Sequence, residues 1–181
     1  MSTLSTDIAW SAADGTPLSQ DPLGLEPISE DTRRRFLRFK LSGTDGALLP
    51  LQDIAEVMQL DALGVLPVPD MPGWLLGVCN WRGEMLWLVD VNVLVGGIPL
   101  WHQTPTVVEP MAIVIQAGNR SVGLVVDLVH DVELVAPESI HPSKEFCSPP
   151  LVPFVVGHLP GHGGAVLDAT AMIEHSLQTP S

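Results

Sequence analysis

The sequence contains few basic residues, and this scarcity excludes several classes of function. Its 181 residues include 8 lysines and arginines against 21 aspartates and glutamates, a formal net charge of −13 at pH 7. A surface with this charge repels nucleic acid and anionic membranes, so neither is expected to be a partner. After residue 40 only three basic residues occur, against 15 acidic ones: Arg82, Arg120 and Lys144. Each of them is therefore a candidate for a specific role.

The sequence also lacks long apolar runs and cysteine motifs. No apolar run approaches the roughly 20 residues that cross a bilayer, and the first residues have neither the basic end nor the apolar core of a secretory signal. Cys79 and Cys147 form no C-x-x-C pair, which predicts two reduced thiols in a cytoplasmic protein. A hydrophobic content of 46% with 16% charged residues is typical of a compact domain with a sizeable core.

A change of composition near residue 33 predicts a domain boundary. Residues 1–33 contain six acids and three prolines without apolar periodicity, which predicts a disordered acidic tail. The domain is then expected to cover residues 34–178.

The first expected strand, residues 33–41, holds five of the eight basic residues. Leu37, Phe39 and Leu41 lie on one face of such a strand, and the other face, which includes Phe36, is largely basic. We expect the basic face to meet the protein's own carboxylates or an acidic partner, because the acidic remainder of the chain argues against nucleic acid.

Beyond this strand, short apolar runs alternate with turn residues. About ten strands and one short helix, Ala169–Leu177 capped by Asp168, predict an all-β fold built from barrels or a sandwich. Residues 52–60 fit both a helix and a strand. Gly123 lies in an expected buried strand, which predicts that another backbone or barrel approaches it closely. A hairpin is expected for residues 111–116 with 121–126, and a final strand pair for residues 154–157 with 164–167.

An Asn-x-Arg-Gly turn between two apolar runs is the most informative stretch of the chain. Gly83 can adopt the positive φ that a tight reversal needs, and Asn80 can bond the backbone of the turn. A hairpin has no need for Arg82. Either this residue is a solvated turn charge, or it takes part in recognition.

The catalytic and metal-binding interpretations are weak. His158 and His162 have a spacing that binds zinc on a helix, but Pro160 and the surrounding glycines favour a strand connection instead. Asp90, Asp127 and Asp168 each follow an apolar run, and we interpret them as caps or turns rather than as paired acid–base carboxylates. No P-loop, dinucleotide fingerprint or nucleophile elbow is present. We expect no enzymatic activity, no metal and no cofactor. A small metal-dependent β-barrel hydrolase is the remote alternative.

Short motifs along residues 36–177 occur in the order found in one known family. The chain is similar to the CheW family, the scaffold proteins of bacterial chemotaxis-type signalling arrays. It departs from that family in its long acidic tail and in the Pro-rich segment 143–153. The matching motifs are Phe39-x-Leu41, Leu49-Pro50-Leu51, Ile54-Ala55-Glu56-Val57, Val68-Pro69-x-x-Pro72, Leu76–Gly83, Leu88–Val91, Val122–Asp127, Ile140-x-Pro142, Gly157 and Val166–Asp168.

This resemblance implies two packed SH3-like five-stranded β-barrels with a short C-terminal helix and no enzymatic activity. It implies an adaptor that couples the regulatory domain of a CheA-type histidine kinase to the cytoplasmic tip of a chemoreceptor, at membrane-associated receptor arrays. The chain is expected to be a stand-alone adaptor, because no receiver domain follows. The alternative is an adaptor of the same fold in a pilus or gliding-motility kinase pathway.

The resemblance also implies which residues bind the partners. The receptor helix is expected in an apolar groove at the junction of the barrels. Ile54, Glu56 and Val57 would line one side of this groove, with Asn80 and Arg82 beside them. Gly123, Val129 and Val132 would come from the second barrel, and Gly77 and Gly83 complete the expected set. The sequence does not decide whether Glu56 and Arg82 face each other.

Overall fold

The computed structural model describes residues 31–41, 46–102, 109–142, 144–145, 147–161 and 164–178. Residues 32–181 form one compact unit. The predicted tail lies outside the described residues except at its end, as does His162. Within the described ranges, no helix has the length and hydropathy needed to cross a membrane.

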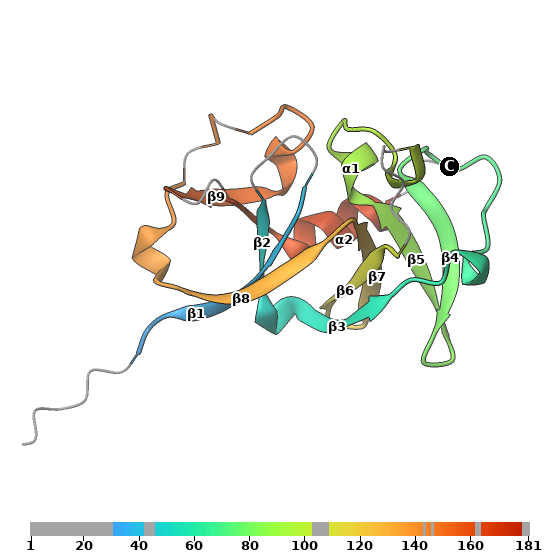
Figure 1. The fold of residues 1–181 in the computed structure, drawn as a ribbon, viewed down its shortest axis with the longest axis horizontal. Helices are drawn as coiled ribbons and strands as arrows, with labels where there is room; N and C mark the ends of the chain where they lie inside the picture. The colour runs from blue at the N-terminus through green and yellow to red at the C-terminus, as the bar shows by residue number, and fades with distance from the viewer. Residues whose placement is uncertain are drawn as a thin grey trace, which may run out of the picture. The chain divides into compact units, whose positions relative to one another are not determined.

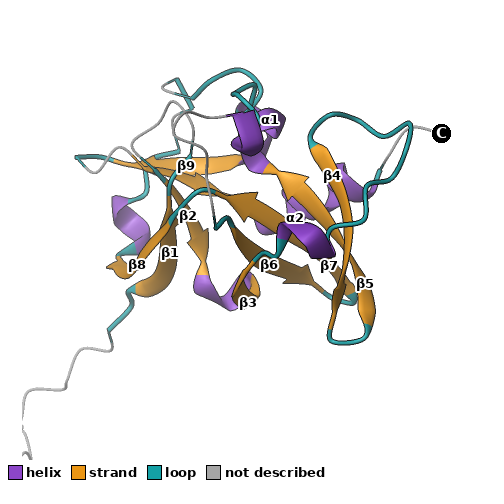
Figure 2. Ribbon diagram, turned by 45° about the vertical axis from the view of Figure 1, so that its right-hand side comes forward, coloured by secondary structure: helices purple, strands orange, loops and turns teal. Residues whose placement is uncertain are grey.

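Strands dominate the described part of the chain (Figures 1 and 2). The strands are β1 (Arg34–Phe39), β2 (Ala47–Pro50), β3 (Ile54–Gln59), β4 (Leu75–Trp81), β5 (Glu84–Asp90), β6 (Met111–Ala117), β7 (Arg120–Val126), β8 (Val129–Val135), β9 (Val155–Leu159) and β10 (Gly164–Leu167). The α-helices are α1 (Val91–Leu94) and α2 (Ala169–Leu177), and the 3-10 turns are η1 (Leu51–Asp53), η2 (Ala62–Gly64), η3 (Leu100–His102), η4 (Pro137–Ser139) and η5 (Val152–Phe154).

The strands form two five-stranded sheets, in the orders β8-β1-β2-β10-β9 and β3-β6-β7-β5-β4. Two of the neighbouring pairs, β2 with β10 and β5 with β7, are parallel, and the others are antiparallel. The second sheet is built from the continuous stretch 54–126, whereas the first takes strands from both ends of the domain. The predicted fold class, all-β with two five-stranded subdomains and a short C-terminal helix, is confirmed.

β1 differs in part from the predicted division into an apolar and a basic face. Leu37 and Phe39 are buried as predicted, but Phe36 on the other face is buried as well. It belongs to a small cluster inside the first sheet, together with Leu48 and Val135. The prediction that basic side chains meet the protein's own carboxylates is confirmed at two positions, where Arg38 pairs with Glu133 and Lys40 with Asp127.

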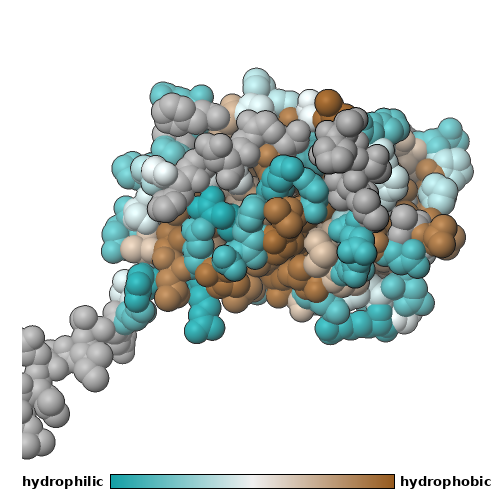
Figure 3. All heavy atoms as spheres, in the orientation of Figure 1, coloured by the Kyte–Doolittle hydropathy of each residue, from teal (hydrophilic) through white to brown (hydrophobic). Residues whose placement is uncertain are grey.

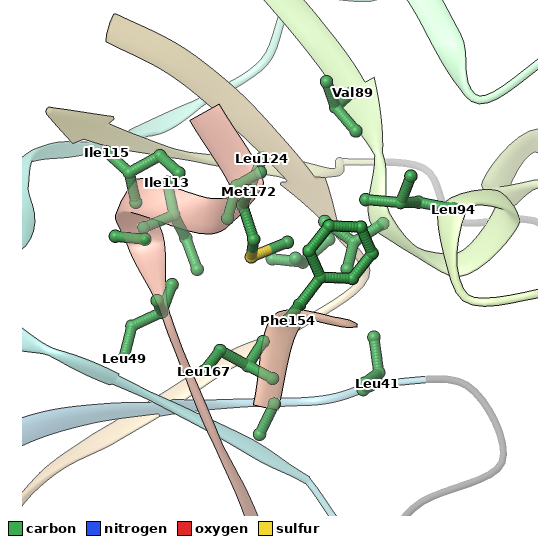
Figure 4. Close-up of a cluster of buried hydrophobic side chains, with 14 of the residues drawn as sticks. Leu41, Leu49, Val89, Leu94, Ile113, Ile115, Leu124, Phe154, Leu167 and Met172 are labelled. Atoms are coloured by element: carbon green, nitrogen blue, oxygen red, sulfur yellow. The ribbon is translucent and has the colours of Figure 1, made fainter. Parts of the chain in front are cut away.

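The main hydrophobic core is shared by the two sheets (Figure 4). Leu49 and Leu167 from the first sheet belong to the same buried cluster as Ile113 and Leu124 from the second. Met172 of α2 is fully buried among them. Burying one such side chain stabilises a fold by about 1.5–3 kcal/mol. Because one cluster draws on both sheets and on α2, the two subdomains hold each other in place.

Two aspartates start the helices. Asp168 caps α2 by accepting a hydrogen bond of 3.1 Å from the backbone N–H of Ala171, which confirms the predicted cap and helix. Asp90 ends β5 and caps α1, and its interpretation as a strand-end cap is also confirmed. Helix α1 was not predicted, because four residues are too few to show a helical period.

The ambiguous segment 52–60 forms a strand rather than a helix. In β3, alternate residues from Ile54 to Met58 are half-buried, and the residues between them are exposed. This strand pairs with β6 along its length, and the pairing resolves the ambiguity because it supplies backbone partners that a helix would not use.

Candidate protein interaction site

The turn between β4 and β5 has the geometry that favours a tight hairpin. Arg82 and Gly83 have φ angles of +53° and +85°, as in a type I′ turn. The Asn80 Oδ1 atom accepts a 3.0 Å hydrogen bond from the N–H of Gly83, so the roles predicted for Asn80 and Gly83 are confirmed. The positive φ of Arg82 was not predicted, since it is uncommon for residues other than glycine.

Arg82 and Glu56 face each other. The Glu56 Oε2 atom lies 2.9 Å from the Arg82 Nη2 atom and accepts a 3.1 Å hydrogen bond from Arg82 Nε. The same oxygen accepts a 2.9 Å hydrogen bond from the Trp81 indole N–H. The guanidinium carbon of Arg82 lies 5.0 Å from the centroid of the Trp81 ring, within reach of a cation–π interaction.

This cluster holds Glu56 in its charged form and leaves part of it open to a partner. The Trp81 hydrogen bond and the charge of Arg82 lower the pKa of Glu56, and they outweigh the opposing effect of its desolvation. The side chain of Arg82 is 65% exposed. Within the described residues, the second carboxylate oxygen, Oε1, has no hydrogen-bond partner. A partner can therefore reach both the guanidinium and the carboxylate.

Exposed apolar side chains occur on β3 and β8, which belong to different sheets. Val57 of β3 is 36% exposed, and Val132 and Leu134 of β8 are 49% and 51% exposed. Figures 1 and 2 place the two strands along the same edge of the fold, and Figure 3 shows apolar atoms gathered on that face. Ile54 and Val129 are half-buried at the starts of these strands.

Gly123 was predicted to lie in the same barrel as the β8 residues Val129 and Val132. This prediction is wrong, because Gly123 lies in the other sheet. It lies buried in β7, in the same sheet as Glu56 and Arg82. A Cβ atom there would lie 2.7 Å from the Leu88 Cδ2 atom and 3.2 Å from the Leu86 Cδ2 atom. The close approach predicted at Gly123 comes from these neighbouring β5 side chains rather than from another barrel.

The other two glycines of the predicted set have local structural roles. Gly77 has a φ of +138°, and a Cβ atom there would lie 2.2 Å from the carbonyl oxygen of Leu66. Leu66 makes two backbone hydrogen bonds to Val78, so the connector passes close over β4. Gly83 completes the hairpin turn. Contact of these glycines with a partner stays a prediction.

The three aspartates that were weighed as acid–base candidates, Asp90, Asp127 and Asp168, make structural contacts. Asp90 and Asp168 cap helices, and Asp127 pairs with Lys40. His158 lies in β9, where it exchanges two backbone hydrogen bonds with His141. In the described part of the chain, no three metal-ligating side chains lie close enough together to hold an ion.

Trp81 is a member of the site that the predicted set of partner-binding residues does not include. Its indole N–H anchors Glu56, and its ring lies against Arg82. The available signal was its position next to Arg82 at the end of an apolar run. Residue order alone does not show that β3 brings Glu56 to this point.

Comparison with known proteins places the chain among CheW proteins. The CheW-like domain profile matches residues 35–176. Chemotaxis protein CheW of Klebsiella aerogenes is 31% identical over 128 residues, which cover 68% of this chain and 72% of that protein. Chemotaxis protein CheW of Rhizobium meliloti is 38% identical over 82 residues, 45% of this chain and 50% of that protein. The chain thus spans about half the length of the latter relative.

The fold also has a counterpart among solved structures. The scaffolding protein TtCheW from Thermoanaerobacter tengcongensis superposes with a TM-score of 0.62 at 20% sequence identity. The superposition covers 75% of this chain and 89% of that one. At this identity the likeness concerns the fold.

Proposed function

Because this chain belongs to the CheW-like family, we propose that it is a non-enzymatic adaptor that couples a CheA-type histidine kinase to chemoreceptors. The observations that carry the proposal are the exposed cluster of Glu56, Trp81 and Arg82 and the exposed apolar side chains on β3 and β8. An adaptor needs such a surface, because it binds by combining apolar contact with a few charged or hydrogen-bonding groups.

The receptor is the partner that suits this surface. A receptor tip presents helices, and an amphipathic helix binds by laying its apolar side into an apolar groove. Val57 and Val132 supply apolar contact in this proposal, and Arg82 and Glu56 supply polar contacts at its margin. Asn80 holds the turn that presents Arg82, and Ile54 and Val129 support the two strands.

The kinase partner follows from the family rather than from one cluster of residues. A regulatory domain with the same fold would contact the end of a barrel, which leaves the receptor surface free. Such an adaptor acts on the cytoplasmic side of the membrane, beside the receptor array.

Affinity purification of the tagged full-length chain from its native cells tests this proposal. We expect a histidine kinase and a chemoreceptor to co-purify, and the receptor to be lost selectively when Arg82 is replaced by glutamate. Arg120→Glu is the matched control, because it changes the charge equally at another exposed arginine that also pairs with a carboxylate. Recovery of neither partner would contradict the proposal, and recovery of a pilus or gliding-motility kinase would assign the adaptor to that pathway.

A further inference from the structure

Arg34 and Arg35, at the start of β1, differ from the arginines that pair with carboxylates in this structure. Both are exposed, and within the described residues neither side chain has a hydrogen bond or an ion pair. This is unexpected in a chain with 21 acidic residues. The carboxylate-paired basic residues are Arg38 with Glu133, Lys40 with Asp127, Arg82 with Glu56 and Arg120 with Glu174.

The two arginines line one open pocket of about 330 Å³ with Pro50, Leu51 and Gln52. Phe36 of β1 lies opposite Pro50 of β2, so the pocket begins where the pairing of these two strands ends. Its lining combines two positive charges, the apolar surface of Pro50 and Leu51, and one amide. This mixture is suited to a ligand that has both charged and apolar parts.

We propose that this Arg34–Arg35 pocket binds an extended acidic segment of a partner protein. Both arginines line this one pocket from consecutive positions at the start of β1, and both are exposed. They are suited to two separate carboxylates, each of which can accept two parallel hydrogen bonds from one guanidinium. Pro50 and Leu51 can contact an aliphatic side chain, and the Gln52 amide can both donate to and accept from a peptide backbone.

Other anionic ligands fit this pocket less well. A single phosphate would leave the apolar surface of Pro50 and Leu51 in the same pocket without a partner. Nucleic acid binds through many phosphate contacts, and the excess of acidic residues on the rest of the chain repels a long polyanion. The same excess repels an anionic membrane.

Fluorescence anisotropy with the full-length chain tests the proposal. The probe is a labelled peptide of alternating glutamate and leucine, and its glutamine counterpart is the uncharged control. We expect Arg34→Glu combined with Arg35→Glu to weaken binding of the glutamate peptide by tenfold or more. The combination of Arg120→Glu with Lys144→Glu makes the same change in net charge elsewhere, and we expect it to have little effect.

Four results would overturn the inference. They are equal binding of the glutamine peptide, equal loss in the control variant, displacement of the peptide by inorganic phosphate at the peptide's own concentration, and capture of the chain by anionic vesicles. Thermal melts establish that each variant is folded, and Arg34→Lys with Arg35→Lys should retain part of the affinity. The inference is independent of the proposed adaptor function, because receptor and kinase recovery are measured separately.

Discussion

At the scale of single residues, Arg82 combines a left-handed backbone with a largely exposed guanidinium. A type I′ turn favours asparagine or glycine at this position, so the arginine is not explained by the turn itself. Its pairing with Glu56 is exposed, and exposed ion pairs contribute only about 0–1 kcal/mol to folding. We therefore predict that Arg82 serves recognition more than stability.

Arg82→Asn should preserve the turn and weaken receptor binding. Asparagine tolerates a positive φ, so we expect a nearly unchanged melting temperature. Loss of one side of a desolvated pair costs roughly 2–5 kcal/mol, so affinity for a receptor-tip fragment should fall at least tenfold, which is about 1.4 kcal/mol. Arg82→Lys should retain part of the affinity, because it keeps the positive charge, but not all of it, because lysine lacks the planar guanidinium. Titration and thermal melts measure both effects, with Arg120→Asn as control. A large loss of stability with unchanged affinity would contradict the assignment.

Gly77→Ala should destabilise the fold more than Gly123→Ala. At Gly77 the added Cβ meets the backbone of Leu66 and the φ is positive, so neither strain can be relieved by a side-chain rotation. We expect a loss of about 2–4 kcal/mol at this position. At Gly123 the added Cβ meets leucine side chains, and we expect about 1–2 kcal/mol. Urea unfolding of both variants gives the comparison, and the reverse order would show that the connector over β4 moves freely.

The residue-scale predictions succeeded where the chemistry is local. The turn roles of Asn80 and Gly83 follow from neighbouring residues, and so does the cap at Asp168. The place of Gly123 was wrong because β7 pairs in parallel with β5, and Gly123 lies opposite Leu88 in that register. No short-range pattern reveals a pairing between residues so far apart in the chain.

At the scale of elements, Asp90 joins β5, α1 and the segment that follows them. Its Oδ1 atom accepts hydrogen bonds of 3.0 and 3.3 Å from Asn92 and Val93, and its Oδ2 atom accepts one of 2.9 Å from Leu100. Burial raises the pKa of Asp90, and the three N–H groups oppose this effect without cancelling it. The fold thus keeps a carboxyl group at a fully buried position, where its side-chain oxygens accept hydrogen bonds from three backbone N–H groups.

Asp90→Asn should change the pH dependence of stability in a defined direction. With its pKa raised in the folded state, Asp90 stabilises most when protonated, and that contribution is lost as pH rises through the folded pKa. Asparagine does not titrate, so the destabilisation of the variant relative to the parent should be smaller at pH of about 7 than at about 4. Urea midpoints of both proteins at the two pH values measure this difference. A larger loss of stability in the variant at neutral pH would mean that the three N–H groups lower the pKa of Asp90 by more than burial raises it.

Elements with strong local signals were predicted best. The pairs β4–β5, β6–β7 and β9–β10 and the helix α2 follow from turn residues, alternation and a cap. The strand β3 was ambiguous, because six residues fit both periods and only the pairing with β6 distinguishes them. Helix α1 is too short to show a helical period, and the hydrogen bond from Leu100 that anchors its cap residue Asp90 spans ten residues.

At the scale of the whole molecule, the shared core predicts that the two sheets unfold together. The tryptophans among the described residues, Trp74, Trp81, Trp87 and Trp101, all lie within or beside the second sheet. In a chain with Trp10 replaced by phenylalanine, fluorescence therefore reports on that sheet, whereas far-UV circular dichroism reports on both. We expect coincident urea transitions by the two methods, because one buried cluster draws on both sheets. A Val156→Trp probe on β9 should share the same midpoint, and separate midpoints would mean that the subdomains are independent.

The interleaved order of the strands also determines when each sheet can form during synthesis. The stretch 54–126 contains every strand of the second sheet, so that sheet can be completed while the rest is still being made. β2 must wait for β10, because Ala47 pairs with Ala165. At 5–20 residues per second, translation of the intervening chain takes about 6–24 s. Until β8 is made, β1 and β2 can pair only with each other, and β2 lacks its second partner until β10 follows. Their open edges are exposed to other nascent chains during this time, and slower translation would prolong the exposure.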